Sequence, residues 1–102
     1  MEKTKFSRHM TTDRADRYVT IATKVGFGEV MYTVERNGQY GLVTMELTST
    51  GVIIVRNNKD KTIITMYCAT VSSVKCYFGL ERMPTNLYFS VRSNEKRGYC
   101  NI

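Results

Sequence analysis

Five side chains in this sequence could together handle a phosphodiester bond. They are its only histidine, two arginines, a threonine and a tyrosine, namely His9, Arg14, Arg17, Thr65 and Tyr67. RNA cleavage without a metal needs a base to take the proton of a 2′-hydroxyl, cations to hold the charged phosphorane, and an acid for the leaving 5′-oxygen. Histidine suits the acid or base role because its unperturbed pKa is about 6.5. The arginine fork can hold two phosphate oxygens.

The spacing of these residues allows them to share one site. Arg14 and Arg17 are three residues apart in a predicted helix, so they emerge on neighbouring sides of one face. His9 lies one short loop upstream. Thr65 and Tyr67 are two apart in a predicted strand and point the same way. That hydroxyl pair could orient a phosphate or relay a proton, provided that the helix packs beside the strand.

Each of these residues also has an ordinary interpretation. A lone histidine near the start of a helix is often a surface or capping residue, and the arginines can pair with Asp13 or Asp16. Thr65 and Tyr67 are good strand formers in any case. The sequence also lacks a second histidine or an obvious carboxylate that would complete an acid–base pair.

The helix that carries the arginines is predicted from caps and periodicity. Thr11, Thr12 or Asp13 can cap its start, and Gly26 can end it. Its apolar residues recur at helical spacing, and they are Ala15, Tyr18, Val19, Ala22 and Val25. We expect the part of this stripe formed by Ala15, Val19 and Ala22 to pack on the sheet. Arg14 and Arg17 would then face the strand that holds Thr65.

From residue 29 the apolar period changes to that of strands. Strands are predicted over 29–34, 40–47, 52–56 and 62–69, with Asn37-Gly38 as a hairpin signal between the first two. Four strands joined by short loops imply an antiparallel meander. Such a sheet needs a covered face, and the N-terminal helix is the available cover.

The C-terminal third is less definite. Residues 71–78 fit a short helix or an extended connector, and residues 87–91 fit a helix or a strand. Met83-Pro84-Thr85 favours a helix start, because proline is tolerated in the first turn. The sequence therefore predicts one α+β domain over residues 1–102. It comprises an N-terminal helix packed on a four-stranded antiparallel β-meander, followed by a short C-terminal helix or an extended tail.

Composition restricts the partners of the chain. Fifteen Lys and Arg against nine Asp and Glu give a net charge of +6 in 102 residues, which favours a polyanionic partner such as RNA. The longest aliphatic run is Val52 to Val55, far too short to cross a bilayer, and no apolar segment follows the N-terminus as in a signal peptide. We therefore expect a cytoplasmic protein without a membrane partner.

The three cysteines do not suggest a framework or a metal site. Cys68, Cys76 and Cys100 are odd in number and share no Cys-x-x-Cys spacing, which agrees with a reducing compartment. A zinc site would need His9 together with all three thiols from distant segments. We expect buried or half-buried thiols, with no metal and no cofactor.

Three segments resemble a known superfamily. Residues 6–17 resemble the histidine-plus-arginine helix start of the barnase–EndoU–colicin–RelE-like small ribonucleases, in particular of their compact phage and mobile-element members. Residues 51–67 resemble their glycine-led apolar strand, turn and Ile-Ile-Thr strand, and residues 77–94 resemble their closing segment.

The resemblance implies a metal-independent endoribonuclease or a toxin-like RNA-cleaving effector. His9, Arg14, Arg17, Thr65 and Tyr67 would form its site, and a toxin of this kind would have an antitoxin-like inhibitor protein. Two alternatives stay open from the residues themselves. One is a catalytically inactive module of a phage or mobile element that binds nucleic acid or protein. The other is an interaction protein without a nucleic-acid role. The sequence does not select an oligomeric state.

Overall fold

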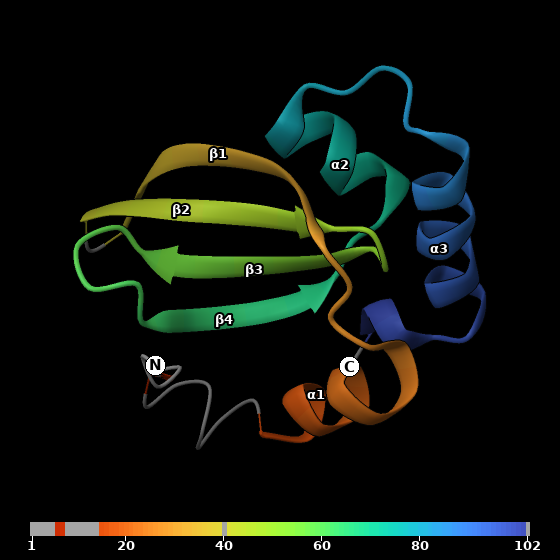
Figure 1. Cartoon of the computed structure of the whole chain (residues 1–102), viewed down its shortest axis with the longest axis horizontal. Coiled ribbons are helices and arrows are strands. Elements are labelled where there is room, and N and C mark those ends of the chain that lie inside the picture. The colour runs from red at the N-terminus through yellow and green to blue at the C-terminus, as the bar shows by residue number, and fades with distance from the viewer. Residues whose placement is uncertain (1–5, 8–14, 40, 102) are drawn as a thin grey trace.

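The computed structural model describes residues 6–7, 15–39 and 41–101 (Figure 1). His9, Arg14 and the predicted caps Thr11, Thr12 and Asp13 lie outside these residues. The described elements are, in chain order, α1 (Ala15–Thr20), the π-helix η2 (Ile21–Val25), β1 (Val30–Gly38), β2 (Gly41–Thr48), β3 (Val52–Asn57), β4 (Ile63–Cys68), α2 (Val71–Phe78), α3 (Thr85–Lys96) and the 3-10 helix η3 (Tyr99–Asn101).

The strands form one antiparallel sheet in the order β1-β2-β3-β4. The predicted α+β class, with its N-terminal helix, four-stranded meander and C-terminal helix, is therefore confirmed. The first hairpin differs from the prediction in detail. Asn37 and Gly38 are paired with Leu42 and Gly41 in the ladder, so the chain reverses after Gly38. Cross-strand pairing outweighs the turn preference of the Asn-Gly pair and lengthens β1 by four residues beyond residue 34.

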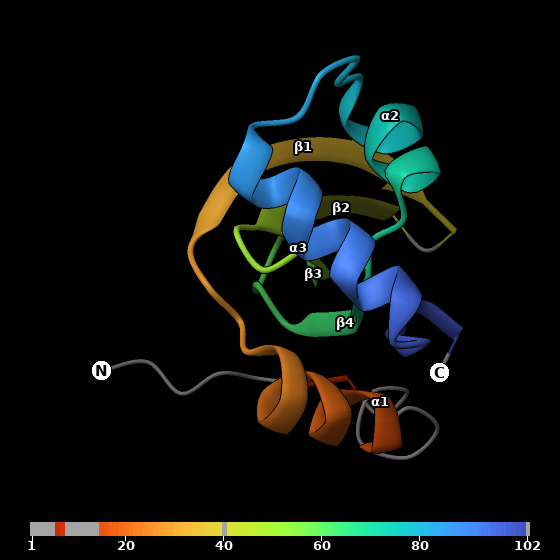
Figure 2. The ribbon, with the colours of Figure 1, turned by 90° about the vertical axis from the view of Figure 1, so that its right-hand side faces the viewer.

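Both faces of the sheet carry a core. Successive residues of a strand point to opposite faces, and β3 is apolar on both. Val52 and Ile54 pack with Ile21 of η2 on one face. Ile53 packs on the other face with residues of α2 and α3, such as Val74 and Leu87. Figure 2 shows α1 set apart from α2 and α3. The sequence predicted only the first of these two covers.

The rotation of the first helix differs from the prediction. Its sheet-facing residues are Tyr18, Ile21 and Val25, whereas Val19 is 54% exposed and Ala15 and Ala22 are exposed. The larger side chains bury more apolar area than the alanines, so they take the inward side. The helix then widens into a π turn, in which the Gly26 amide donates to the Ile21 carbonyl at 2.7 Å.

The C-terminal segments are helices. The Thr70 hydroxyl accepts a hydrogen bond from the Ser73 amide and the Ser73 hydroxyl accepts one from the Thr70 amide, so a capping box starts α2. Residues 71–78 are therefore a helix and not an extended connector. The second helix, α3, follows Pro84 and buries Leu87, Val91 and Asn94 at helical spacing, which excludes the strand interpretation of residues 87–91.

Candidate functional site

Thr65 and Tyr67 are two residues apart in β4, and both lie on the face of the sheet that α2 and α3 cover. Thr65 is paired with Val55 and Tyr67 with Ile53, and Ile53 belongs to the core under α2 and α3. Both polar residues are half-buried. The two hydroxyl-bearing side chains thus share one face, as their spacing of two predicts.

The surroundings of Tyr67 fix the protonation of its phenol. Burial, followed by the neighbouring Tyr77, raises the pKa of Tyr67 to about 12, against the opposing effect of Arg17 and Arg36. A phenol with this pKa keeps its proton near neutrality. Tyr67 can therefore donate a hydrogen bond to an anion, but it cannot act as a base there.

Arg36 and Tyr77 extend this group of residues across the face. The guanidinium carbon of Arg36, on β1, lies 4.8 Å from the centroid of the Tyr77 ring, on α2. This is the geometry of a cation–π contact. Sequence reasoning missed both residues. Alternation along β1 places Arg36 on the same face as Tyr32 and Val34. Its contact with Tyr77 could not be predicted, because that contact requires residues 71–78 to form a helix.

Arg17 reaches the outer edge of β4 from the opposite face. Its Nη1 donates a long hydrogen bond of 3.5 Å to the carbonyl oxygen of Met66, which stands between Thr65 and Tyr67 in the strand. The Arg17 charge also lowers the pKa of Tyr67 and of Cys68, although burial dominates and raises both. The guanidinium therefore lies beside the strand that carries Thr65, at the edge between the two faces.

The N-terminal segment pairs with the same outer edge of β4, near the start of the strand. Phe6 makes a parallel bridge to Ile63. The Ser7 amide donates to the Ile63 carbonyl, and its hydroxyl donates to the Ile64 carbonyl, both at 2.8 Å. His9 follows Ser7 by two residues in the sequence. The structure thus brings Arg17, Thr65 and Tyr67 together around β4, while His9 and Arg14 lie outside the described residues.

A second feature, on the α1 face, is a cavity of about 340 Å³ lined by the rings of Phe6, Tyr18 and Phe27. An ion pair stands in its wall, with Arg56 Nε 2.7 Å from Glu46 Oε1. Arg56 ends an aliphatic strand in the sequence, so it resembled a solvated strand end. Its partner Glu46 lies on the neighbouring strand β2, and only the register of the sheet brings the two side chains together in the cavity wall.

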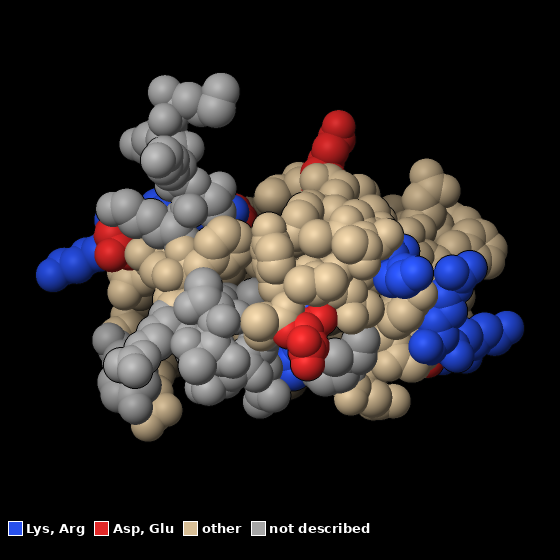
Figure 3. Space-filling view, turned by 90° about the horizontal axis from the view of Figure 1, so that it is seen from below, with Lys and Arg blue, Asp and Glu red and all other residues tan. Residues whose placement is uncertain are grey.

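Basic residues gather at the α3 end of the molecule (Figure 3). Lys24 and Arg97 line a polar hollow of about 390 Å³ together with Phe89, Ser93 and Tyr99. Neither cation has a carboxylate partner among the residues that the structure describes. Basic side chains beside exposed rings are suited to a nucleic-acid strand.

No helix within the described ranges is long and apolar enough to span a membrane. Comparison with known proteins returned no family model, no curated protein and no solved structure that matches this chain.

Proposed function

We propose that this protein is a metal-independent endoribonuclease whose site lies at the outer edge of β4 and on the adjoining α2/α3 face. The observation that carries the proposal is the contact between Arg17 and the Met66 carbonyl. It brings a guanidinium from α1 to the strand that presents Thr65 and Tyr67. This contact supports the proposal because the Arg17 guanidinium lies beside the backbone between Thr65 and Tyr67.

The residues divide the chemistry as follows. His9 serves as the general acid or base, because imidazole is the side chain in this group that exchanges a proton near neutrality, and water exchanges the other proton of the reaction. Arg14 and Arg17 hold the scissile phosphate and stabilise the charge that grows on the phosphorane. Thr65 positions the phosphate. Tyr67, which retains its proton, donates a hydrogen bond to it.

The rest of the α2/α3 face supports the binding of a single RNA strand. Arg36 adds a positive charge, and Tyr77, which is 38% exposed, offers a ring on which an unpaired base can stack. The net charge of +6 and the hollow at Lys24 and Arg97 favour a polyanion.

Incubation of the purified protein with mixed-sequence RNA in excess EDTA tests the proposal. We expect cleavage, with 2′,3′-cyclic phosphate ends, because the 2′-hydroxyl is the nucleophile. RNA that stays intact at high concentrations of a folded protein contradicts the proposal. If the activity is that of a toxin, the protein also has an antitoxin-like inhibitor, and co-expression of that inhibitor abolishes cleavage.

One observation favours a second function, a catalytically inactive module of a phage or mobile element that binds nucleic acid or protein. The sequence has a single histidine, and the raised pKa of Tyr67 removes its phenol as a second proton-exchanging group near neutrality. In that case the wild-type protein does not cleave RNA, and His9→Ala leaves binding unchanged. Binding that is insensitive to salt would indicate a protein partner.

A further inference from the structure

The cavity on the α1 face has the size and the walls of a small-molecule site. Its volume of about 340 Å³ lies at the small end of the range of roughly 300–1,000 Å³ that is usual for ligand pockets. Ile54 and Met66 form part of its apolar lining. The cavity opens on the face opposite to that of Thr65 and Tyr67, and it adjoins the proposed cleavage site at the edge of β4, where Phe6 and Met66 line it.

Three aromatic rings from distant segments meet along this cavity. Phe6 comes from the segment that pairs with β4, Tyr18 from α1, and Phe27 from the connection to β1. The Phe6 and Tyr18 centroids lie 5.1 Å apart at 76°, and the Tyr18 and Phe27 centroids lie 6.0 Å apart at 35°. These rings offer an aromatic surface against which a planar ligand can stack.

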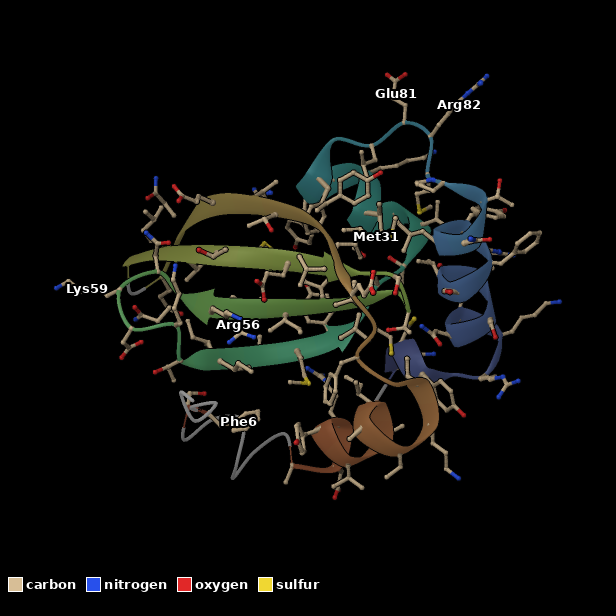
Figure 4. The ribbon with its side chains drawn as sticks, viewed as in Figure 1. Phe6, Met31, Arg56, Lys59, Glu81 and Arg82 are labelled. Carbon is tan, nitrogen blue, oxygen red and sulfur yellow. The ribbon has the colours of Figure 1, made fainter. Side chains whose placement is uncertain are left out.

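The polar part of the wall is the ion pair of Glu46 and Arg56. Phe6 and Arg56 are labelled in Figure 4, one from the N-terminal segment and the other from β3. Arg56 uses Nε for Glu46 Oε1 and Nη1 for the Lys61 carbonyl, at 2.7 and 3.2 Å. Within the described residues, Arg56 Nη2 and Glu46 Oε2 have no hydrogen-bond partner. The wall thus offers one charged donor beside one charged acceptor.

This combination selects among ligand classes. A fatty chain would leave Arg56 Nη2 and Glu46 Oε2 without hydrogen-bond partners, which is costly in a partly enclosed site. A free phosphate would face the Glu46 carboxylate and make no use of the rings. A nucleobase satisfies both requirements, because its Watson–Crick edge carries an acceptor next to a donor and its faces stack. A bicyclic purine covers more of a three-ring wall than a pyrimidine does.

We propose that the cavity bounded by Phe6, Tyr18, Phe27, Glu46 and Arg56 binds an unpaired purine base. Arg56 Nη2 donates to the acceptor of the base edge, at N1 of adenine or O6 of guanine. Glu46 Oε2 accepts from the neighbouring donor, at N6 of adenine or N1 of guanine. The base belongs either to a free nucleotide or to a single-stranded RNA, and the chemistry recognised is the same. The inference does not rest on the proposed cleavage, since base binding and strand scission are measured separately.

Titration of the full-length protein with nucleotides, followed by NMR, tests this inference. We expect AMP and GMP to bind at least about tenfold more tightly than ribose 5-phosphate, which lacks the base, with shifts centred on Tyr18, Phe27 and Glu46. They should also bind more tightly than CMP, because the single ring of cytosine covers less of the aromatic wall. Methylation of adenine at N1 blocks the edge, so 1-methyl-AMP should lose about tenfold in affinity. This comparison needs no protein variant, so it remains decisive if a substitution prevents folding.

Two variants test whether the ion pair of Glu46 and Arg56 recognises the base. Glu46→Gln should weaken AMP binding by about tenfold or more, because the charged acceptor is lost. Arg92→Gln, which breaks an exposed pair of the same 2.7 Å length with Glu95, should leave binding unchanged. Equal binding of ribose 5-phosphate and AMP, equal binding of AMP and 1-methyl-AMP, or no binding of either purine nucleotide overturns the inference.

A uridine oligomer with one central adenosine separates the two sources of the base. If the base comes from RNA, this oligomer binds more tightly than AMP and more tightly than an all-uridine oligomer. If the ligand is a free nucleotide, AMP binds at least as tightly as the oligomer. Either result supports the purine pocket, whereas an all-uridine oligomer that matches the adenosine oligomer, together with no AMP binding, contradicts it.

Discussion

Two neighbouring residues of β4, Tyr67 and Cys68, hold their protons more tightly in the folded chain than they would in water. Burial is the main cause in both, and it raises the pKa of Tyr67 to about 12 and that of Cys68 to about 11. They face opposite cores, so the two cores both become less stable in alkali. The same effect makes the Tyr67 phenol a steady hydrogen-bond donor over the neutral range.

Cys68 makes this effect measurable at one residue. A thiol whose pKa rises on folding from 9.0 to about 11 contributes stability that is fully present below pH 9 and is lost as the pH rises toward 11. We expect the urea midpoint of the wild-type protein to fall over that range, and to fall less in Cys68→Ala. Cys76→Ser, at an exposed thiol, is the control and should follow the wild type. Equal alkaline losses in wild type and Cys68→Ala would contradict this assignment.

At the scale of elements, α3 is held against the turn between β2 and β3. The Asn94 amide donates to the Thr50 carbonyl at 2.9 Å, and the Gly51 carbonyl accepts from the Ala69 amide at 2.8 Å. Gly51 has φ of +82°, and a Cβ there would lie 3.1 Å from Asn94 Nδ2 and 3.2 Å from Val91 Cγ2. The turn therefore requires glycine both for its backbone conformation and for the close approach of the helix.

Gly51→Ala should lower the free energy of unfolding by about 2 kcal/mol or more, since left-handed strain and crowding add. Gly79→Ala is the matched control, because Gly79 has φ of +65° but nothing within 4 Å of the added Cβ. It should cost only about 1 kcal/mol, from the left-handed conformation alone. Urea denaturation measures both, and equal losses in the two variants would show that α3 does not press on Gly51.

The elements also show how far sequence reasoning reaches. The four strands and the shared face of Thr65 and Tyr67 were predictable, because the two-residue period of a strand leaves no choice of side. The rotation of α1 was not, because the sequence offers two overlapping stripes, and the stripe of Tyr18 and Ile21 buries more area than that of Ala15. The second helical cover was not predictable either, because the sequence of residues 71–78 fits both a helix and an extended connector. The hydrogen bonds of the capping box at Thr70 decide for the helix.

For the candidate site, the sequence predicted the strand and the helix that carry its residues, but not the long-range contacts between side chains. Arg17 was expected beside the strand of Thr65, and its contact with Met66 agrees with that expectation. Arg36 and Arg56 escaped notice because each gains its meaning from a partner far away in the sequence, Tyr77 and Glu46 respectively. Long-range pairing of this kind depends on sheet register and helix packing, which a local pattern does not encode.

At the scale of the whole molecule, the proposed binding of RNA should depend on salt, because the chain has a net charge of +6 and two of its cations line one hollow. Each phosphate contact on a single strand adds about 0.7 to the slope of log affinity against log salt. Lys24→Ala with Arg97→Ala should therefore reduce that slope by about 1.4 between roughly 50 and 200 mM salt. Fluorescence anisotropy with a short labelled RNA measures the slope.

The matched control removes one Lys and one Arg elsewhere. Lys59→Ala with Arg82→Ala alters two exposed residues at other ends of the molecule (Figure 4) and should leave the slope nearly unchanged. If both double variants change the slope equally, the contact is a general effect of net charge. The hollow at Lys24 and Arg97 then has no special part in binding.

The most direct test of the central claim is the rate of RNA cleavage in EDTA by wild-type protein, Arg17→Ala and Arg92→Ala. Arg17 is proposed to stabilise charge in the transition state, so its loss should slow cleavage by about 100-fold or more. Arg92 is an exposed arginine of α3 outside the proposed site, and its loss should leave the rate within about twofold. Thermal melting confirms that both variants fold. Equal cleavage rates for the two variants, or no cleavage by the folded wild-type protein, would contradict the account.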